Sequence, residues 1–158
     1  MKSVLVVTCL FFAALIGQAA SAETTSSKTY LNETTGESLE ITAMTLDSEE
    51  DARLLAEVWI NGTVVDAADD ITFWFNEDLS EDVTREAGAD RITIVQVVDQ
   101  DINIIGVAMV MQRDTTVHLM VYLGDRIDKV SAVSFMIDFV HDGVDATPPE
   151  GFEEQPSR

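Results

Sequence analysis

Residues 92–123 read ITIVQVVDQDINIIGVAMVMQRDTTVHLMVYL, and the pattern of this segment gives the first prediction about the fold. The segment contains three apolar runs rich in β-branched residues, namely Ile92–Val98, Ile102–Gln112 and Val117–Leu123. Only the short polar joints Asp99–Asp101 and Arg113–Thr116 separate them. Such joints are too short for a crossover helix, so we expect the three runs to be antiparallel neighbours in one sheet. A similar run at Val130–Val140 predicts a further strand.

The residues before this segment also show strand patterns. Leu39–Ala43 and Ile71–Phe75 place apolar residues at every second position. Asn61-Gly62 lies between two short apolar runs, Val58–Ile60 and Thr63–Val65. Because Asn-Gly supplies the positive φ angles of a type I′ turn, these two runs are predicted to form a hairpin.

Two segments carry helix signals. Glu77–Ala87 has acidic residues in its first turn, apolar residues at every fourth position and Gly88 as a stop signal. Ser48–Ala56 begins with a capping-box pattern, although its apolar residues fit a strand equally well. Together the patterns predict a mainly β fold, an antiparallel immunoglobulin-like β-sandwich with one or two short helices. The alternative is an α+β fold in which a helix covers one face of an antiparallel sheet.

The N-terminus has the three parts of a secretory signal peptide. Lys2 is followed by the apolar run Val4–Ile16 and then by Ala20-Ser21-Ala22, small residues suited to cleavage. We therefore expect residues 1–22 to be removed and the mature chain to be exported, either periplasmic or secreted. The apolar run is shorter than the roughly 20 residues of a membrane span, so no membrane insertion is expected after cleavage. Cys9, the only cysteine, leaves with the signal peptide, and the mature domain is cysteine-free.

Composition divides the rest of the chain into three parts. Residues 23–37 are rich in Thr and Ser and nearly free of apolar side chains, which is typical of a flexible linker. Residues 38–141 contain the strand and helix patterns and predict a single β-rich domain. Residues 142–158 hold all three prolines and several acidic residues, which predicts a disordered acidic tail. On this interpretation, truncating both end segments leaves the melting temperature nearly unchanged.

The charge of the chain restricts its partners. The formal net charge is −20, and removal of Lys2 without any acidic residue makes it −21 in the mature chain. Nucleic acids and anionic membranes bind basic surfaces, so neither is an expected partner. A protein partner with a basic surface is electrostatically favoured. The same charge also suits an exported protein adapted for solubility, and it says nothing about oligomeric state.

No pattern in the sequence predicts catalysis. The chain has no G-x-S-x-G, no H-E-x-x-H, no phosphate-binding glycine loop and no dinucleotide fingerprint. Its histidines are His118 and His141 alone. Paired carboxylates would allow a carboxylate-dependent secreted hydrolase, but acidic residues at this density are more typical of a solvated surface. We predict that the chain is not an enzyme and needs no cofactor.

A group of methionines and one histidine forms the most specific pattern. If Arg113–Thr116 closes a hairpin, Met111 lies opposite His118 and Met109 lies opposite Met120 on one face of two strands. Three thioethers and an imidazole are a soft ligand set suited to Cu(I) or Ag(I). Ordinary core packing explains the same residues, because methionine fills irregular gaps. A shift of one residue in the strand register would also separate the four side chains.

The two tryptophans form a second candidate site. In the predicted strands, Trp59 and Trp74 fall on the polar side of the alternation, where an exposed ring can stack on a ligand. A covering helix or the N-terminal segment would bury them instead. The leading hypothesis is therefore an exported non-catalytic binding module, most plausibly for another protein. The alternative is a soft-metal protein for Cu(I) or Ag(I), and the hydrolase is the third.

Overall fold

The computed structural model describes residues 22–61, 63–65, 70–98, 101, 103–124, 129–142 and 146–156, with the backbone alone at 22–24, 63–65, 70–77 and 129–133. The predicted signal peptide, apart from Ala22, lies outside the described residues. The strands are β1 (Ala22–Asn32), β2 (Glu37–Leu46), β3 (Thr63–Val65), β4 (Asp70–Asp78), β5 (Arg91–Val98), β6 (Ile104–Arg113), β7 (Thr116–Leu123) and β8 (Glu153–Glu154). The helices are α2 (Glu49–Asn61), α3 (Glu81–Glu86) and α4 (Lys129–Asp142). None of the helices in the described ranges combines the length and the apolar character that a membrane crossing requires.

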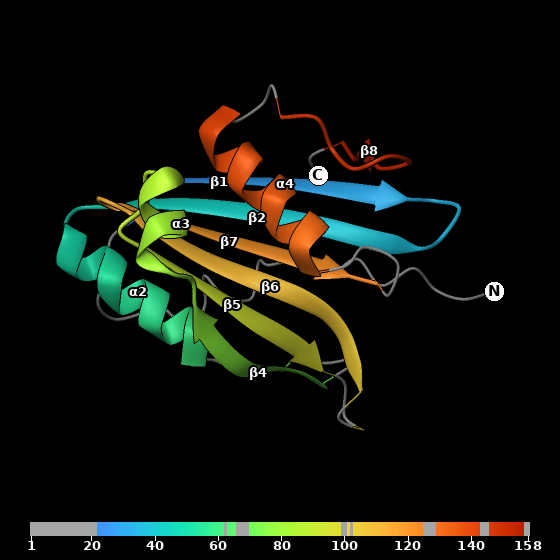
Figure 1. The fold of residues 1–158 in the computed structure, drawn as a ribbon, viewed down its shortest axis with the longest axis horizontal. Coiled ribbons are helices and arrows are strands. Elements are labelled where there is room, and N and C mark those ends of the chain that lie inside the picture. The colour runs from blue at the N-terminus through green and yellow to red at the C-terminus, as the bar shows by residue number, and fades with distance from the viewer. Residues whose placement is uncertain are drawn as a thin grey trace.

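One antiparallel sheet contains all eight of these strands, in the order β3-β4-β5-β6-β7-β2-β1-β8 (Figure 1). The mainly β prediction with a few short helices is therefore confirmed. Immunoglobulin-like packing is not confirmed, because it needs a second sheet and the described strands form a single one. Helices cover this sheet instead; the alternative prediction placed a helix on one face only, whereas α4 and α2 pack in separate core clusters.

Helices lie against both faces of the sheet. One core cluster joins Phe135 and Met136 of α4 to Met109 of β6. A second cluster joins Trp59 of α2 to Val110 of β6. Successive strand residues point to opposite faces, so Met109 and Val110 place the two clusters on opposite sides. Figure 1 shows α4 lying across the strands of the first face. β6 is consequently buried at every position from Gly106 to Gln112, as expected for a strand covered on both faces.

The predicted hairpin around Asn61-Gly62 is wrong, because Val58–Ile60 belongs to α2. The Ser48 hydroxyl oxygen accepts a hydrogen bond from the Asp51 amide at 3.1 Å, which caps the helix as the capping-box pattern predicted. The buried residues of α2 recur at helical spacing, namely Ala52, Leu55, Ala56, Trp59 and Ile60. This helical pattern of buried residues covers more of the chain than the alternating pattern around Trp59. It therefore determines the secondary structure of the segment. Asn61 is the last helical residue, and only Thr63–Val65 forms the predicted strand.

The predicted strand at Val130–Val140 is also wrong, because these residues form α4. The part of α4 with described side chains buries Phe135 and Met136 and packs Phe139 and Val140 partly against the same cluster. These four positions lie on one side of a helix, since residues three or four apart are neighbours there. The helix predicted at Glu77–Ala87 exists in a shorter form, α3. It starts after Ser80, whose hydroxyl accepts a hydrogen bond from the Val83 amide.

The predicted linker at residues 23–37 is wrong. Ala22–Asn32 forms β1, which pairs with β2 from Ala22↔Leu46 to Asn32↔Glu37. Thr is β-branched and fits a strand, so a segment rich in Thr and Ser is compatible with a sheet edge as well as with a linker. Tyr30 is buried and packs edge-on against Phe135 with 6.2 Å between ring centroids. The segment is therefore part of the folded domain.

The predicted disordered tail is wrong for residues 146–156. Ala146 and Phe152 are buried in the same core cluster as Tyr30. Glu153–Glu154 forms β8, which pairs with Tyr30 and Leu31 at the outer edge of β1. The remaining tail positions, 143–145 and 157–158, lie outside the described residues.

Candidate functional site

The β6–β7 hairpin brings the predicted methionines and histidine together. Its register pairs Gln112 with Val117, so Met111 lies opposite His118 and Met109 lies opposite Met120. This is the predicted pairing. The tight turn between the strands contains Asp114 at φ 48°, a backbone angle that Asp tolerates better than most residues.

The surroundings of this group are apolar. The three methionines Met109, Met111 and Met120 are fully buried in the core cluster under α4. Neighbouring strands place Ile92 opposite Met111 and Ile41 opposite Met120. The cross-strand neighbours on this face have hydrocarbon side chains without ligand atoms, namely Ile41, Ala43, Ile92 and Ile94. The group therefore combines sulfur atoms with an otherwise hydrocarbon environment.

A fourth methionine joins this group from the covering helix. Met136 of α4 is fully buried in the same cluster. Sequence analysis missed it because Val130–Val140 was interpreted as a strand. The signal that would have found it is the helical spacing of Phe135, Met136, Phe139 and Val140, which fits one face of a helix.

His118 is the polar member of the group. Its Nδ1 atom is buried and has no hydrogen-bond partner among the described residues. Burial, together with the positive charge of Arg113, lowers the pKa of His118 from 6.5 to about 4. Arg113 is held nearby by the carbonyl oxygens of Ala87 and Gly88, at 2.7 and 2.9 Å. The imidazole is therefore neutral at pH 7 and offers a free lone pair or N–H.

Lowering the pH should weaken folding through His118. The unfolded chain takes up this proton near pH 6.5, whereas the folded chain takes it up only near pH 4. The stability that neutral His118 contributes is thus complete above pH 6.5 and is lost as the pH falls toward 4. We expect the unfolding free energy of wild type to fall by about 2 kcal/mol relative to His118→Leu over this window, after allowance for partial exposure.

The measurement is urea denaturation of both proteins at several pH values from 7 to 4. Taking the difference between them cancels the titration of the many carboxylates that both proteins share. A difference that stays constant across the window would contradict the assigned pKa.

Of the two residues of the predicted tryptophan site, only Trp59 has a described side chain. Trp59 is fully buried on the inner face of α2, so the expectation that its ring is exposed is wrong. A ring without exposed surface offers no face on which a ligand can stack. Trp74 has its backbone in β4 opposite Gln96, and its side chain lies outside the described residues.

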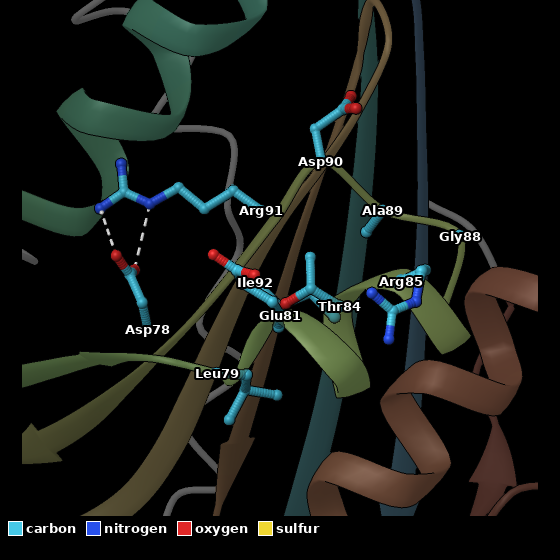
Figure 2. Close-up of a pocket in the computed structure, with 10 residues that line it drawn as sticks. All are labelled: Asp78, Leu79, Glu81, Thr84, Arg85, Gly88, Ala89, Asp90, Arg91 and Ile92. Carbon is cyan, nitrogen blue, oxygen red and sulfur yellow. Dashed lines mark hydrogen bonds and ion pairs between the residues drawn. The ribbon is translucent and has the colours of Figure 1, made fainter.

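A pocket of about 520 Å³ lies between α3 and the start of β5 (Figure 2). Figure 2 shows Arg91 directed at Asp78, and their hydrogen bonds measure 3.0 and 3.3 Å. Arg91 also pairs with Glu57 of α2. The hydrogen bond from Thr93, together with Arg91, holds the pKa of Asp78 below its ordinary value. Arg91 thus pairs with one carboxylate from α2 and one from β4, and these ion pairs tie α2, β4 and β5 together.

The outer edge of β1 is a feature that sequence analysis missed, and within the described ranges most of it has no pairing strand. β2 pairs with the whole of β1, but among the described residues β8 pairs only with Tyr30 and Leu31. The amide of Gln155 donates to the carbonyl oxygen of Thr29 at 2.8 Å, which shows that the backbone of Thr29 faces outward. Along a strand, the N–H and C=O groups of successive residues point alternately to one neighbouring strand and to the other. Thr25 and Ser27 therefore also direct their N–H and C=O groups outward, away from β2.

The exposed large apolar side chains of the described part are spread over three elements. Leu54 and Val58 are on α2, Val83 is on α3 and Ile104 is on β6. Leu54 and Val58 are neighbours one turn apart, and a pair of this size, like the single residues Val83 and Ile104, is normal on a protein surface. The unpaired edge of β1 is therefore a more distinctive feature than any apolar patch in this part of the chain.

Comparisons of the chain with protein-family models, with curated proteins and with solved structures find no match.

Proposed function

We propose that this chain is an exported, non-catalytic module that binds another protein by pairing with an extended segment of it along the outer edge of β1. The observation that supports this most strongly is the unequal pairing of β1. Its inner edge pairs with β2 over Ala22–Asn32, whereas in the part of the chain that the structure describes β8 pairs only with Tyr30 and Leu31 on the outer edge. An unpaired strand edge is a template for a further strand, and its backbone hydrogen bonds supply affinity.

The side chains along this edge suit a reversible contact. Thr25, Ser26 and Ser27 are exposed. Their small polar groups keep the free edge soluble, and they present no bulky side chain that would stop another backbone from approaching. Specificity then has to come from the neighbouring surface, because backbone pairing alone does not distinguish sequences.

The charge of the chain supports a partner segment that carries Lys or Arg. The full chain has a formal net charge of −20, and exposed Glu153 and Glu154 lie directly beside the free edge on β8. Lys28, the one basic residue of β1, already pairs with Glu154 at 3.6 Å. A second copy of the chain would bring the same net charge and is repelled, so a basic partner is favoured over self-association.

We expect a short lysine-containing peptide of strand-forming residues to bind this edge, and its glutamate counterpart to bind at least about tenfold more weakly, because like charges across an interface are costly. Binding is measured by calorimetry at low and high salt, and raised salt should weaken the lysine peptide. Equal affinity of the two peptides would contradict the charge argument. Concentration-dependent dimers in sedimentation would show that a second copy occupies the edge, which would also contradict the proposal.

Two adjacent proline substitutions separate binding from folding. Thr25→Pro replaces an outward N–H by a ring, so it should block the peptide while changing stability by about 0.5 kcal/mol or less. Ser26→Pro removes an N–H that faces β2, so it should cost about 3 kcal/mol or more of stability. Thr25 is preferred to Ser27 because the Ser27 hydroxyl lies 3.4 Å from that of Thr42. Full peptide affinity in Thr25→Pro would overturn the assignment of the edge.

A further inference from the structure

The core beneath α4 is unusually rich in thioethers. Four of the six methionines of the chain lie in this one cluster, on three elements. Met109 and Met111 belong to β6, Met120 to β7 and Met136 to α4. Each is fully buried. Thioether sulfur is a neutral, soft ligand that prefers monovalent copper or silver to zinc, magnesium or calcium.

The buried nitrogen of His118 is the second, independent observation. An unpaired buried polar atom costs about 1–3 kcal/mol, so a structure that keeps one calls for a reason. No described residue donates to or accepts from Nδ1. On the same face, Met111 lies opposite His118 on β6, and Met120 is two residues further along β7. The other cross-strand neighbour is Ala43, which has only a methyl group.

The distances between neighbouring strands allow these atoms to share one ion. Directly opposed residues in an antiparallel pair have Cβ atoms about 4.5–5.5 Å apart, within reach of a methionine and a histidine side chain that converge on one atom. Alternate residues of one strand lie on the same face, which places Met120 beside His118.

We propose that His118, Met111 and Met120 bind one Cu(I) or Ag(I) ion, with Met109 and Met136 as the adjacent sulfur atoms of the cluster. All of these ligands are neutral, so they suit a single positive charge. Harder divalent ions need carboxylates or several imidazoles, and the described residues contain no group of three His, Cys, Asp or Glu side chains that would hold one. This metal site is separate from the proposed protein-binding function. It uses side-chain sulfur and nitrogen atoms, whereas the protein-binding edge uses backbone amides and carbonyl groups.

The chain offers a matched control for the test. Met44 is also buried, but it lies in the other core cluster, on the face covered by α2. Met111→Leu and Met44→Leu make the same change of side chain in two cores, and both keep the volume nearly constant. Only Met111→Leu removes a ligand of the proposed ion. His118→Leu removes the nitrogen ligand.

The experiment is a titration of the folded chain with Cu(I) in competition with a chromophoric Cu(I) chelator, without oxygen. Wild type and Met44→Leu should bind one equivalent with equal affinity. Met111→Leu and His118→Leu should bind at least about tenfold more weakly, since even the loss of an outer-shell partner costs about 10–100-fold. An excess of Zn(II) or Ca(II) should not displace the ion.

Methionine methyl resonances give a second measurement that needs no variant. With methyl-labelled methionine, one equivalent of Ag(I) should shift the signals of Met111 and Met120 and leave that of Met44 in place. Equal affinities of the Met111→Leu and Met44→Leu proteins would overturn the proposal. Unmoved Met111 and Met120 signals at one equivalent of Ag(I) would overturn it as well, and either result would assign the cluster to core packing alone.

Discussion

A chain that lacks residues 23–37 should not fold. The deletion removes nearly all of β1, which pairs with β2 along its whole length and carries β8 on its other side. It also removes Tyr30, whose buried ring packs against Phe135 of α4. Losing the aromatic side chain alone costs about 3–5 kcal/mol, a large fraction of the 5–15 kcal/mol that stabilises a typical domain.

The deletion has a further cost inside the polar part of the core. Glu37 is buried, and its Oε1 accepts a hydrogen bond from the Tyr122 hydroxyl at 2.6 Å. Without Glu37, the Tyr122 hydroxyl loses this hydrogen bond, and a hydrogen bond to a charged group contributes about 1.5–3 kcal/mol. Circular dichroism during heating measures the result, with Glu33→Ala at the exposed turn as the control that should melt like wild type. A cooperative transition of the shortened chain within a few degrees of wild type would contradict the structure.

Gly106→Ala should be the most damaging single methyl addition among the described glycines. A Cβ atom at Gly106 would lie 2.0 Å from the carbonyl oxygen of Tyr122 and 3.0 Å from its carbonyl carbon. Both atoms belong to the backbone of β7, which is fixed by its pairing with β6 and β2. The strand therefore cannot move aside without breaking its ladder. Overpacking usually costs about 1–3 kcal/mol, and we expect at least the upper end of that range here.

The control for Gly106 is a glycine with open space around it. A Cβ atom at Gly36 meets nothing within 4 Å, so Gly36→Ala tests only the strain of its φ of +77°. That strain costs about 1–2 kcal/mol. Urea denaturation of the two variants should rank Gly106→Ala as clearly less stable. A smaller loss in Gly106→Ala than in Gly36→Ala would show that β6 and β7 are not as close as described.

Local patterns predicted the central hairpin well. The joint between β6 and β7 is short and polar, and both flanking runs are apolar enough to leave one favoured register. That register placed Met111 opposite His118, as the structure does. Short antiparallel connections depend on neighbouring residues, so their geometry is accessible from the sequence.

Sequence patterns failed where a segment is defined by distant contacts. β1 resembles a linker in composition, and it becomes a strand because β2 pairs with it. α4 contains an apolar run that fits either a strand or a helix until its packing against the sheet is known. The free edge of β1 and the contribution of Met136 both follow from these two elements, so neither was predictable from local sequence.

Residue-resolved amide exchange of the folded chain, free and bound to the lysine-containing peptide, tests the central claim most directly. In the free protein the amides of Thr25 and Ser27 face outward and should exchange quickly, whereas that of Ser26 faces β2 and should exchange slowly. We expect the bound peptide to slow amide exchange at Thr25 and Ser27 and to leave the exchange rate at Ser26 almost unchanged. The reason is that a new strand pairs only with the outward N–H and C=O groups. Binding of the peptide without slower exchange at Thr25 and Ser27 would place its site elsewhere and contradict the account.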